Sequence, residues 1–269
     1  MNPIRLTPGV KTLLIIYGVV FLLQQTIDTF FGGGLLYTFG LVPAEFVIHH
    51  RFYQLFTYSF FHAEVLHVFF NCLMLAFIGP DIESTWGRTK FLQYYFFCIL
   101  SSGLIYLLFM MFKEVGLTAP MVGASGGLYG LLIAYGLIFG ERTMLFMMLF
   151  PMKAKHFVWI LAAIEFMTTA FSRGGGTAGV AHLGGMGAGF CYLWVRATLS
   201  IKRRQKAKGE LQGFSRALQK LKALNPNSKR KASNHLKLII NNARDQAKPK
   251  PKGKSGDEDD HDGNPKTWH

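Results

Sequence analysis

The stretch Met121-Val-Gly-Ala-Ser125-Gly-Gly-Leu-Tyr-Gly130 places a serine among four glycines in the middle of a long apolar sequence. A serine hydroxyl in hydrocarbon costs free energy unless it has a hydrogen-bond partner, and each glycine within a helix costs about 1 kcal/mol relative to alanine. The pattern Gly123-x-Ser125-x-Gly127 matches the nucleophile elbow of soluble hydrolases, but that elbow follows a strand of a soluble sheet, and no such strand is predicted here. We therefore expect the partner of Ser125 to lie on another apolar helix.

A later apolar stretch, Gly179-Val-Ala-His182-Leu-Gly-Gly185, supplies a candidate partner for Ser125. Serine and histidine together are the minimum for a nucleophile activated by a base. Glycines at the small-xxx-small spacing let membrane helices approach closely, and this chain has two such pairs: Gly126 with Gly130, and Gly185 with Gly189. We expect these glycines to bring Ser125 within hydrogen-bond reach of His182.

Composition and hydropathy indicate a membrane protein. Half of the 269 residues are hydrophobic and the mean hydropathy is +0.24, which is too apolar for an ordinary soluble domain of this size. Six apolar windows are long enough to cross a bilayer: about 12–31, 63–80, 91–112, 122–140, 156–172 and 178–199. The predicted fold is all-α, a polytopic six-transmembrane-helix bundle within residues 1–200.

The charge distribution predicts the topology. The net charge of +14 belongs mostly to the tail, because residues 1–200 carry a net +3 and residues 201–269 a net +11. Six spans place both termini on one side, and the positive residues near the ends of the spans gather on that side. We therefore expect a multi-pass protein of the cell (inner) membrane, with both termini cytoplasmic and the site opening to the extracytoplasmic side.

The segments outside the spans are predicted as follows. Residues 201–247 form a basic, partly amphipathic-helical cytoplasmic tail, with helices at 210–224 and about 236–243, and residues 248–269 are disordered. The tail is expected to attract anionic lipid and no nucleic acid, since no recognition motif accompanies its charge. The aromatic segment 32–60 is expected to lie in the outer interface, and Met144–Pro151 to be interfacial or re-entrant.

The depth of three polar side chains in the membrane points to a common site. Counting at 1.5 Å per residue from the charge that ends each helix, Ser125 lies about 24 Å above the cytoplasmic end, and His182 and His67 about 21 Å. Three polar groups on three predicted helices therefore share one level in a core about 30 Å thick.

The three cysteines, Cys72, Cys98 and Cys191, show no metal-type spacing and are expected to be inert helix residues. No metal or other cofactor is expected.

Two pairs of residues spaced four apart add to this site. His67 and Asn71 share a face of the second predicted helix, and an imidazole with an amide can donate hydrogen bonds to a developing oxyanion. Tyr129, four residues after Ser125, is expected to stack on His182. A lone membrane serine ordinarily bonds a carbonyl of its own helix, so the case for a site rests on these residues together.

Other polar residues leave alternatives open. His62 and Glu64 fit simple interface residues as well as site residues. Glu165, within the fifth predicted helix, is expected to hydrogen-bond another helix rather than to act in catalysis, since ionisable groups in a membrane need partners. Arg173-Gly-Gly-Gly176 is a candidate hinge for a lid over the site.

At these residues the chain resembles the rhomboid family of intramembrane serine proteases, of the bacterial type with an added basic C-terminal extension. The resemblance covers about residues 12–199, and three segments carry it in the family's order: His67-Val-Phe-Phe-Asn71 resembles the H-x-x-x-N motif, Gly123-Ala-Ser125-Gly126 the G-x-S-G motif, and Ala181-His182-Leu-Gly-Gly185 the A-H-x-x-G motif.

The resemblance implies a Ser-His dyad without an aspartate, with Ser125 as nucleophile and His182 as base. It further implies an oxyanion hole made by His67, Asn71 and the backbone amide of Ser125. Supporting positions are Tyr129, Gly123, Gly126, Gly185, His62 and Glu83, the last as a structural acid. Where the family commonly has Trp-Arg, this chain has Tyr53-Gln54, and we expect the hydrogen bonding of that loop to differ.

The function predicted is hydrolysis of peptide bonds in or near transmembrane segments of membrane-protein substrates by an intramembrane serine endopeptidase. The alternative is a non-catalytic rhomboid-like membrane-protein binder or chaperone, which would be expected to lack Ser125 or His182. A transporter is a further alternative, but it predicts internal repeats and a midplane site, whereas these polar residues lie near one surface.

Overall fold

The computed structural model describes residues 6–114, 116–146, 150–171, 177–223 and 233–241. The chain divides into two compact units, Met1–Ser200 and Ile201–His269, and the second begins where the sequence turns basic. In the tail, residues 201–223 belong to α9 and residues 233–241 are helical. The hinge predicted at 173–176 and the disorder predicted for 248–269 lie outside the described residues.

Helices build the first unit, and all six predicted spans lie on helices: α1 (Pro8–Phe30), α5 (Val65–Trp86), α6 (Arg88–Lys113), α7 (Ser125–Ile138), α8 (Ala154–Phe171) and α9 (Thr177–Ala223). In the described part of the chain, four of them, α1, α5, α6 and α8, are long and apolar enough to cross a membrane. The fifth, α7, has 14 residues, and the sixth predicted span is the glycine-rich first half of α9. The predicted all-α polytopic bundle is confirmed.

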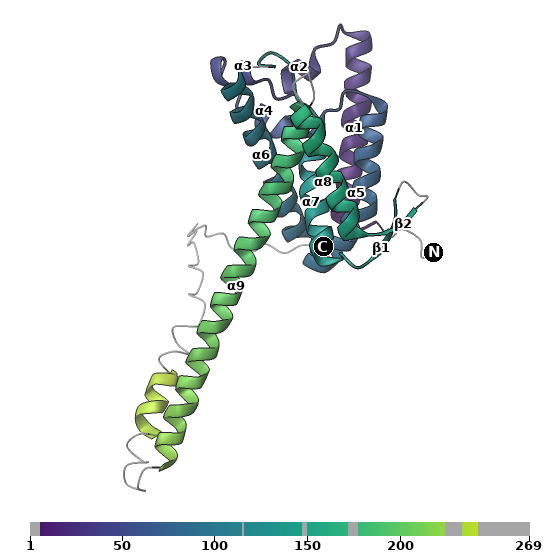
Figure 1. The fold of residues 1–269 in the computed structure, drawn as a ribbon. Coiled ribbons are helices and arrows are strands. Elements are labelled where there is room, and N and C mark those ends of the chain that lie inside the picture. Colours follow the sequence, from purple (N-terminus) through teal and green to yellow (C-terminus); the bar gives the residue numbers. More distant parts are fainter. Residues whose placement is uncertain (1–5, 115, 147–149, 172–176, 224–232, 242–269) are drawn as a thin grey trace, which may run out of the picture. The chain divides into compact units, whose positions relative to one another are not determined.

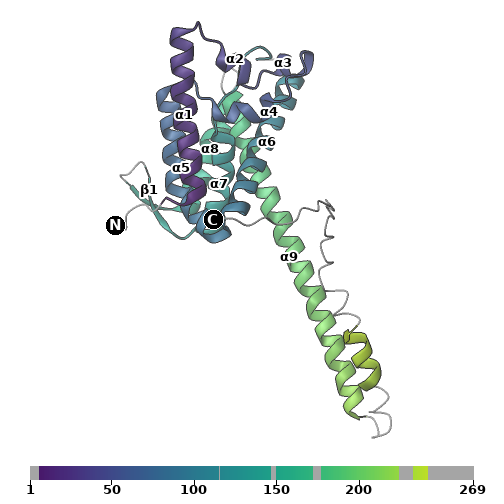
Figure 2. The same ribbon diagram turned by 180° about the vertical axis from the view of Figure 1, so that it is seen from behind.

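The connection between α1 and α5 folds into short helices rather than one long amphipathic segment. These are α2 (Leu35–Phe39), α3 (Pro43–Ile48), α4 (Gln54–Thr57) and the 3₁₀ turn η1 (Tyr58–Phe60). In both views they gather at one end of the bundle, and the hairpin of β1 (Thr143–Phe146) and β2 (Phe150–Lys153) lies at the opposite end (Figures 1 and 2).

The hairpin covers the segment Met144–Pro151, which was predicted to be interfacial or re-entrant. The described residues there form two antiparallel strands, with Leu145 opposite Pro151. A proline cannot donate to a ladder, but both strands of a two-stranded sheet are edges, where the missing N–H is tolerated. Apart from the isolated bridge between Leu41 and Met121, these two strands are the β-structure of the described residues.

The second predicted span, about 63–80, lies on α5, which continues through Pro80 to Trp86. Proline removes one helical hydrogen bond, which other groups in a membrane bundle can replace. The helix ends at Gly87, whose φ of 79° lies in the left-handed region, and α6 begins at the next residue. The extra turns carry Glu83 into the bundle.

Glu83 is buried and caps the start of α1. Its carboxylate accepts hydrogen bonds from the backbone N–H groups of Gly9 at 2.8 Å and Val10 at 2.9 Å, and from the hydroxyl of Thr7. The first N–H groups of a helix lack acceptors within the helix, and a negative charge there is favoured by the helix dipole. Glu83 thus ties α5 to α1 at the end of the bundle that carries the hairpin.

Replacing Glu83 by alanine is expected to lower the free energy of unfolding by about 2–4 kcal/mol, since two buried N–H groups lose a charged acceptor. Thermal unfolding in detergent measures the effect. The matched control is Glu141→Ala, since Glu141 is exposed and pairs with Lys153 and Lys155, whose hydrogen bonds lower its pKa to about 2. Equal stability losses in the two variants would contradict the capping role.

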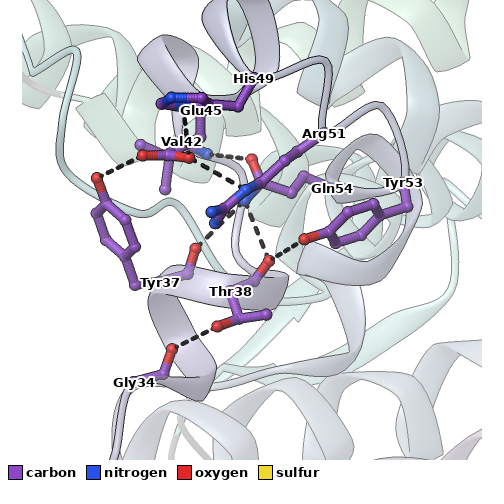
Figure 3. A network of polar contacts seen from close by, with 9 residues as sticks. All are labelled: Gly34, Tyr37, Thr38, Val42, Glu45, His49, Arg51, Tyr53 and Gln54. Carbon is purple, nitrogen blue, oxygen red and sulfur yellow. Dashed lines mark hydrogen bonds and ion pairs between the residues drawn. The ribbon is translucent and has the colours of Figure 1, made fainter.

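The loop that contains Tyr53 and Gln54 is held by its own hydrogen bonds (Figure 3). The fully buried Gln54 side chain accepts from the N–H of Val42 at 3.1 Å and donates to the carbonyls of Tyr37 at 3.2 Å and Thr38 at 3.1 Å. The Tyr53 hydroxyl donates to the Thr38 carbonyl at 3.0 Å. An amide in place of the family's usual arginine therefore still satisfies the backbone of α2 and α3.

A second set of contacts in this loop centres on Glu45. Its carboxylate lies 3.1 Å from Arg51 Nε and 3.0 Å from His49 Nδ1, and it accepts the Tyr37 hydroxyl at 3.0 Å (Figure 3). The last hydrogen bond raises the pKa of Tyr37. Together with Gln54, these contacts hold the short helices as one layer over the end of the bundle.

Candidate active site

The site is built where α7 meets α9. A Cβ atom added to Gly185 would lie 2.8 Å from the carbonyl carbon of Gly126, and one added to Gly189 would lie 3.1 Å from the Cα of Gly130. Real Cβ atoms essentially never show the first distance and seldom the second, so larger residues would push the two helices apart. The two glycine pairs singled out by their spacing thus face each other and place α7 and α9 in backbone contact.

Ser125 is the first residue of α7, and its side chain reaches across to α9. Its Oγ lies 2.7 Å from Nε2 of His182. The predicted span began earlier, at residue 122, so the serine stands at a helix N-terminus rather than inside a helix. This position matters, because the first N–H groups of a helix have no acceptor within it and point outward from the helix end.

A buried hydroxyl on α6 fixes the height of α9 next to the histidine. Ser102 donates a hydrogen bond of 2.6 Å to the carbonyl of Ala181. The same serine also lies against Gly126, where an added Cβ would approach its Cβ to 2.6 Å. Three helices therefore meet within one turn of the Ser125–His182 contact.

The ring of His182 has contacts on one face and at Nδ1. Tyr129 stacks on it, with ring centroids 4.3 Å apart and planes inclined by 15°. Glu165 of α8 places Oε1 2.9 Å from His182 Nδ1 and also accepts the hydroxyl of Tyr129. The stacking agrees with the expectation for Tyr129. Glu165 bonds another helix, as expected. Its contact with His182, the predicted general base, was not part of that expectation.

The H-x-x-x-N pair of α5 lies beside Gly123, two residues before Ser125. A Cβ on Gly123 would lie 2.6 Å from His67 Nε2 and 3.7 Å from Asn71 Nδ2. Gly123 has a φ of +115°, a conformation that side chains disfavour, so glycine is required here for both conformation and space. Both predicted donors therefore stand beside the backbone that leads into Ser125.

Unpaired polar atoms collect in this region. Among the described residues, the buried side-chain nitrogens without a hydrogen-bond partner are Asn71 Nδ2, His182 Nδ1 and both ring nitrogens of His62. For His182 Nδ1, the approach to Glu165 meets the distance of a hydrogen bond but not its angle. An unsatisfied buried donor costs about 1–3 kcal/mol. Of these atoms, Asn71 Nδ2 and His182 Nδ1 belong to residues of the predicted site.

His62 lies behind His67 rather than at the serine. Its ring is fully buried, with its centroid 5.0 Å from that of His67 and 5.7 Å from that of Tyr17. The side chain of Gln24 on α1 forms two hydrogen bonds with the backbone of His62: it donates to the carbonyl at 2.8 Å and accepts from the N–H at 3.2 Å. Burial, followed by the influence of His67, lowers the pKa of His62 to about 3. A neutral ring therefore supports His67.

The three cysteines are free thiols on α5, α6 and α9. Among the described residues, no three or more His, Cys, Asp or Glu side chains are arranged to hold a metal ion.

Comparisons with known proteins agree with one another. The family model described as "Rhomboid domain" matches residues 49–198. The chain is similar to "Rhomboid protein 1, mitochondrial" of Saccharomyces cerevisiae, with 28% identity over 149 residues, 55% of this chain and 43% of that protein. It is also similar to "RHOMBOID-like protein 1" of Arabidopsis thaliana, with 32% identity over 154 residues, 56% of this chain and 36% of that protein.

A third relative, "Rhomboid-like protein 15" of Arabidopsis thaliana, is 24% identical over 196 residues, 68% of this chain and 45% of that protein. The matched part of the chain thus spans less than half the length of each of these relatives. The matched region contains α5 to α8 and the first half of α9, the helices that supply Ser125, His182, His67 and Asn71.

Proposed function

The chain belongs to the rhomboid family, and from that premise we propose that it is an intramembrane serine endopeptidase that hydrolyses peptide bonds in or near transmembrane segments of membrane-protein substrates. The observation that carries the proposal is the 2.7 Å contact between Ser125 Oγ and His182 Nε2. A hydroxyl bonded to an imidazole, with the ring oriented by further groups, is the geometry of an activated nucleophile. A purely binding relative has no need of this contact.

In the first step, Ser125 Oγ attacks the carbonyl carbon of the scissile peptide bond. The hydroxyl proton passes to His182 Nε2, and the electron pair of the C=O bond moves to the oxygen. Donors placed for that oxygen are the Asn71 amide, the His67 imidazole and the N–H of Ser125 at the start of α7, where the helix dipole adds positive potential. The buried Asn71 Nδ2 gains in this state the acceptor that it otherwise lacks.

In the second step, the C–N bond breaks and the leaving nitrogen takes the proton from His182 Nε2, which leaves an ester on Ser125. A water molecule then gives a proton to Nε2 as its oxygen attacks the ester carbon. The Oγ–carbonyl bond breaks, Ser125 recovers the proton, and the new carboxyl end departs. Water must therefore reach Ser125, which requires a path from one surface of the membrane.

The contacts around Ser125 support a path from the extracytoplasmic side. Met121 forms a β-bridge with Leu41, and Gly123 N–H donates to the Tyr58 carbonyl at 2.9 Å, so the site lies at the end of the bundle covered by the short helices. The opposite end carries the hairpin, with Lys153 on β2 and with Arg142 and Lys155 next to its strands. Positive residues favour the cytoplasm, so we place that end and both termini there.

The substrate is a transmembrane protein whose helix is unwound near the outer interface, because a regular helix keeps its carbonyls hydrogen-bonded. Substrates with glycine, proline or small residues there fit this requirement. Large apolar side chains are exposed on α5 and α8 and offer lipid-facing surfaces along which such a segment can approach: Val65, Leu66, Phe69, Phe70, Trp159, Ile164 and Phe166.

A fluorophosphonate probe tests the proposal without knowledge of the natural substrate. The purified full chain in detergent is expected to be labelled at Ser125 and to cleave a model single-span protein with glycine near its outer interface, because only an activated serine attacks phosphorus or a carbonyl. Ser125→Ala is expected to lose both activities. Cleavage by Ser125→Ala at the wild-type rate, or a wild type that is neither labelled nor active, would reject the proposal.

A further inference from the structure

Glu165 is the only acidic residue of α8. An ionised carboxylate within a membrane helix costs free energy and is expected to have a partner and a function. Its side chain is 15% exposed and meets two groups of the site, His182 Nδ1 at 2.9 Å and the Tyr129 hydroxyl. The family resemblance implies a serine and a histidine without an acid, so this carboxylate is a feature of this chain that the resemblance does not explain.

The tautomer of His182 gives this contact a chemical consequence. Because Nε2 faces Ser125 Oγ and must accept its proton, the proton of the neutral ring has to be on Nδ1. Nδ1 is the nitrogen that faces Glu165 Oε1. A carboxylate there favours this tautomer and attracts the imidazolium that forms when the proton of Ser125 arrives.

Tyr129 explains why the resting contact is bent. Its ring is stacked on the imidazole while its hydroxyl bonds the same Oε1. The rings of Tyr129 and His182 lie in different, nearly parallel planes, so Glu165 Oε1 cannot lie in both planes. The N–H bond of Nδ1 lies in the plane of the imidazole and therefore does not point straight at this oxygen. Contacts of this kind tighten when the histidine becomes charged, because the attraction then acts between two full charges in a region of low dielectric.

The backbone around Glu165 is held against α9. Thr169 donates to the Glu165 carbonyl at 2.7 Å, and a Cβ on Gly179 would lie 3.2 Å from that carbonyl oxygen and 3.3 Å from Thr169 Cβ. The turn of α8 that carries the carboxylate is therefore packed on the first turn of the helix that carries His182. Such support fixes the distance between the two side chains.

We propose that Glu165 is a positioning residue for His182, completing a Ser125–His182–Glu165 arrangement drawn from three helices; this inference rests on the function proposed above. The carboxylate keeps its charge throughout, and the proton of Ser125 stays on Nε2 until the leaving nitrogen takes it. Glu165 holds the ring in the reactive tautomer and orientation and stabilises the imidazolium.

The test compares Glu165→Gln with wild type for cleavage of the single-span substrate and for the rate of fluorophosphonate labelling. Glutamine keeps the size but removes the charge, so kcat and the labelling rate are expected to fall together by about 100-fold or more, with KM changed by less than about two-fold. Glu165→Asp is expected to recover part of the loss. A structural role alone would not produce this split between kcat and KM.

Two controls bracket the result. Glu141→Gln makes the same chemical change on an exposed residue beyond the end of α7, and Thr168→Val alters an exposed hydroxyl that donates to the Glu165 carbonyl at 3.0 Å. Both are expected to keep wild-type kcat. A Glu165→Gln variant with kcat and labelling within about three-fold of wild type would overturn the inference.

If Glu165→Gln proves unstable in detergent, the rates of Glu165→Asp and Glu165→Asn are compared instead, since these two side chains match in size and differ in charge. Aspartate is expected to be at least about 10-fold faster than asparagine, and equal rates would overturn the inference. If the wild type is active and a charge-neutral variant is equally active, the role of Glu165 is rejected and the proposed function stands. An inactive, unlabelled wild type rejects the proposed function and this inference with it.

Discussion

Replacing His182 by alanine is expected to reduce kcat/KM for substrate cleavage by about 10⁴-fold or more, because Ser125 then has no group to take its proton. At neutral pH an unassisted serine hydroxyl is a weak nucleophile. Labelling of Ser125 by a fluorophosphonate should fall in parallel, even though the serine itself is intact. This parallel loss separates activation of the nucleophile from binding of the substrate.

The measurement includes the double variant Ser125→Ala/His182→Ala. Residues that act as one unit give non-additive effects, so the double variant is expected to be no slower than either single variant. His156→Ala is the matched control, since His156 is an exposed histidine at the start of α8. Losses that multiply in the double variant, or a similar loss in His156→Ala, would show that Ser125 and His182 do not work together.

Replacing Gly185 by valine is expected to abolish both activities, because the new side chain would collide with the backbone of Gly126 and force α9 away from α7. A displacement of about 1 Å between reacting groups costs about 100-fold in rate. A branched side chain at this contact requires α7 and α9 to separate by more than that distance. With alanine instead, the free energy of unfolding is expected to fall by about 1–3 kcal/mol from overpacking.

Gly187 offers the matched control on the same helix. A Cβ added there meets nothing within 4 Å. Gly187→Ala is therefore expected to be neutral or to stabilise the protein by up to about 1 kcal/mol through helix propensity, and Gly187→Val to keep activity. Thermal unfolding and labelling rates of the four variants give the comparison. Equal behaviour at positions 185 and 187 would refute the argument that backbone contact between α7 and α9 sets the Ser125–His182 distance.

Several features of the site follow from local sequence. The apolar windows predicted which segments form the long helices, since a spanning helix needs a continuous apolar run. The spacing of Gly126 with Gly130 predicted a close helix contact, which the structure contains. The i, i+4 spacing of Ser125 and Tyr129 placed a ring near the histidine. Each of these predictions depends on periodicity along one chain segment.

Other features go beyond what the local pattern predicted. The second apolar window covers about residues 63–80, and α5 continues through Pro80 to Trp86 and brings Glu83 to the start of α1. The expectation for Met144–Pro151 concerned its place in the membrane interface and did not foresee that β1 pairs with β2. The helix that begins at Ser125 was expected to start earlier.

The sequence by itself determined that this chain is a bundle of membrane helices, and it predicted one depth for Ser125, His182 and His67, because span length and residue count along a helix set height. Only the tertiary structure decided which side chains face one another at that depth. The contact of Glu165 with His182 depends on how α8 and α9 are rotated about their own axes, and packing against neighbouring helices sets that rotation.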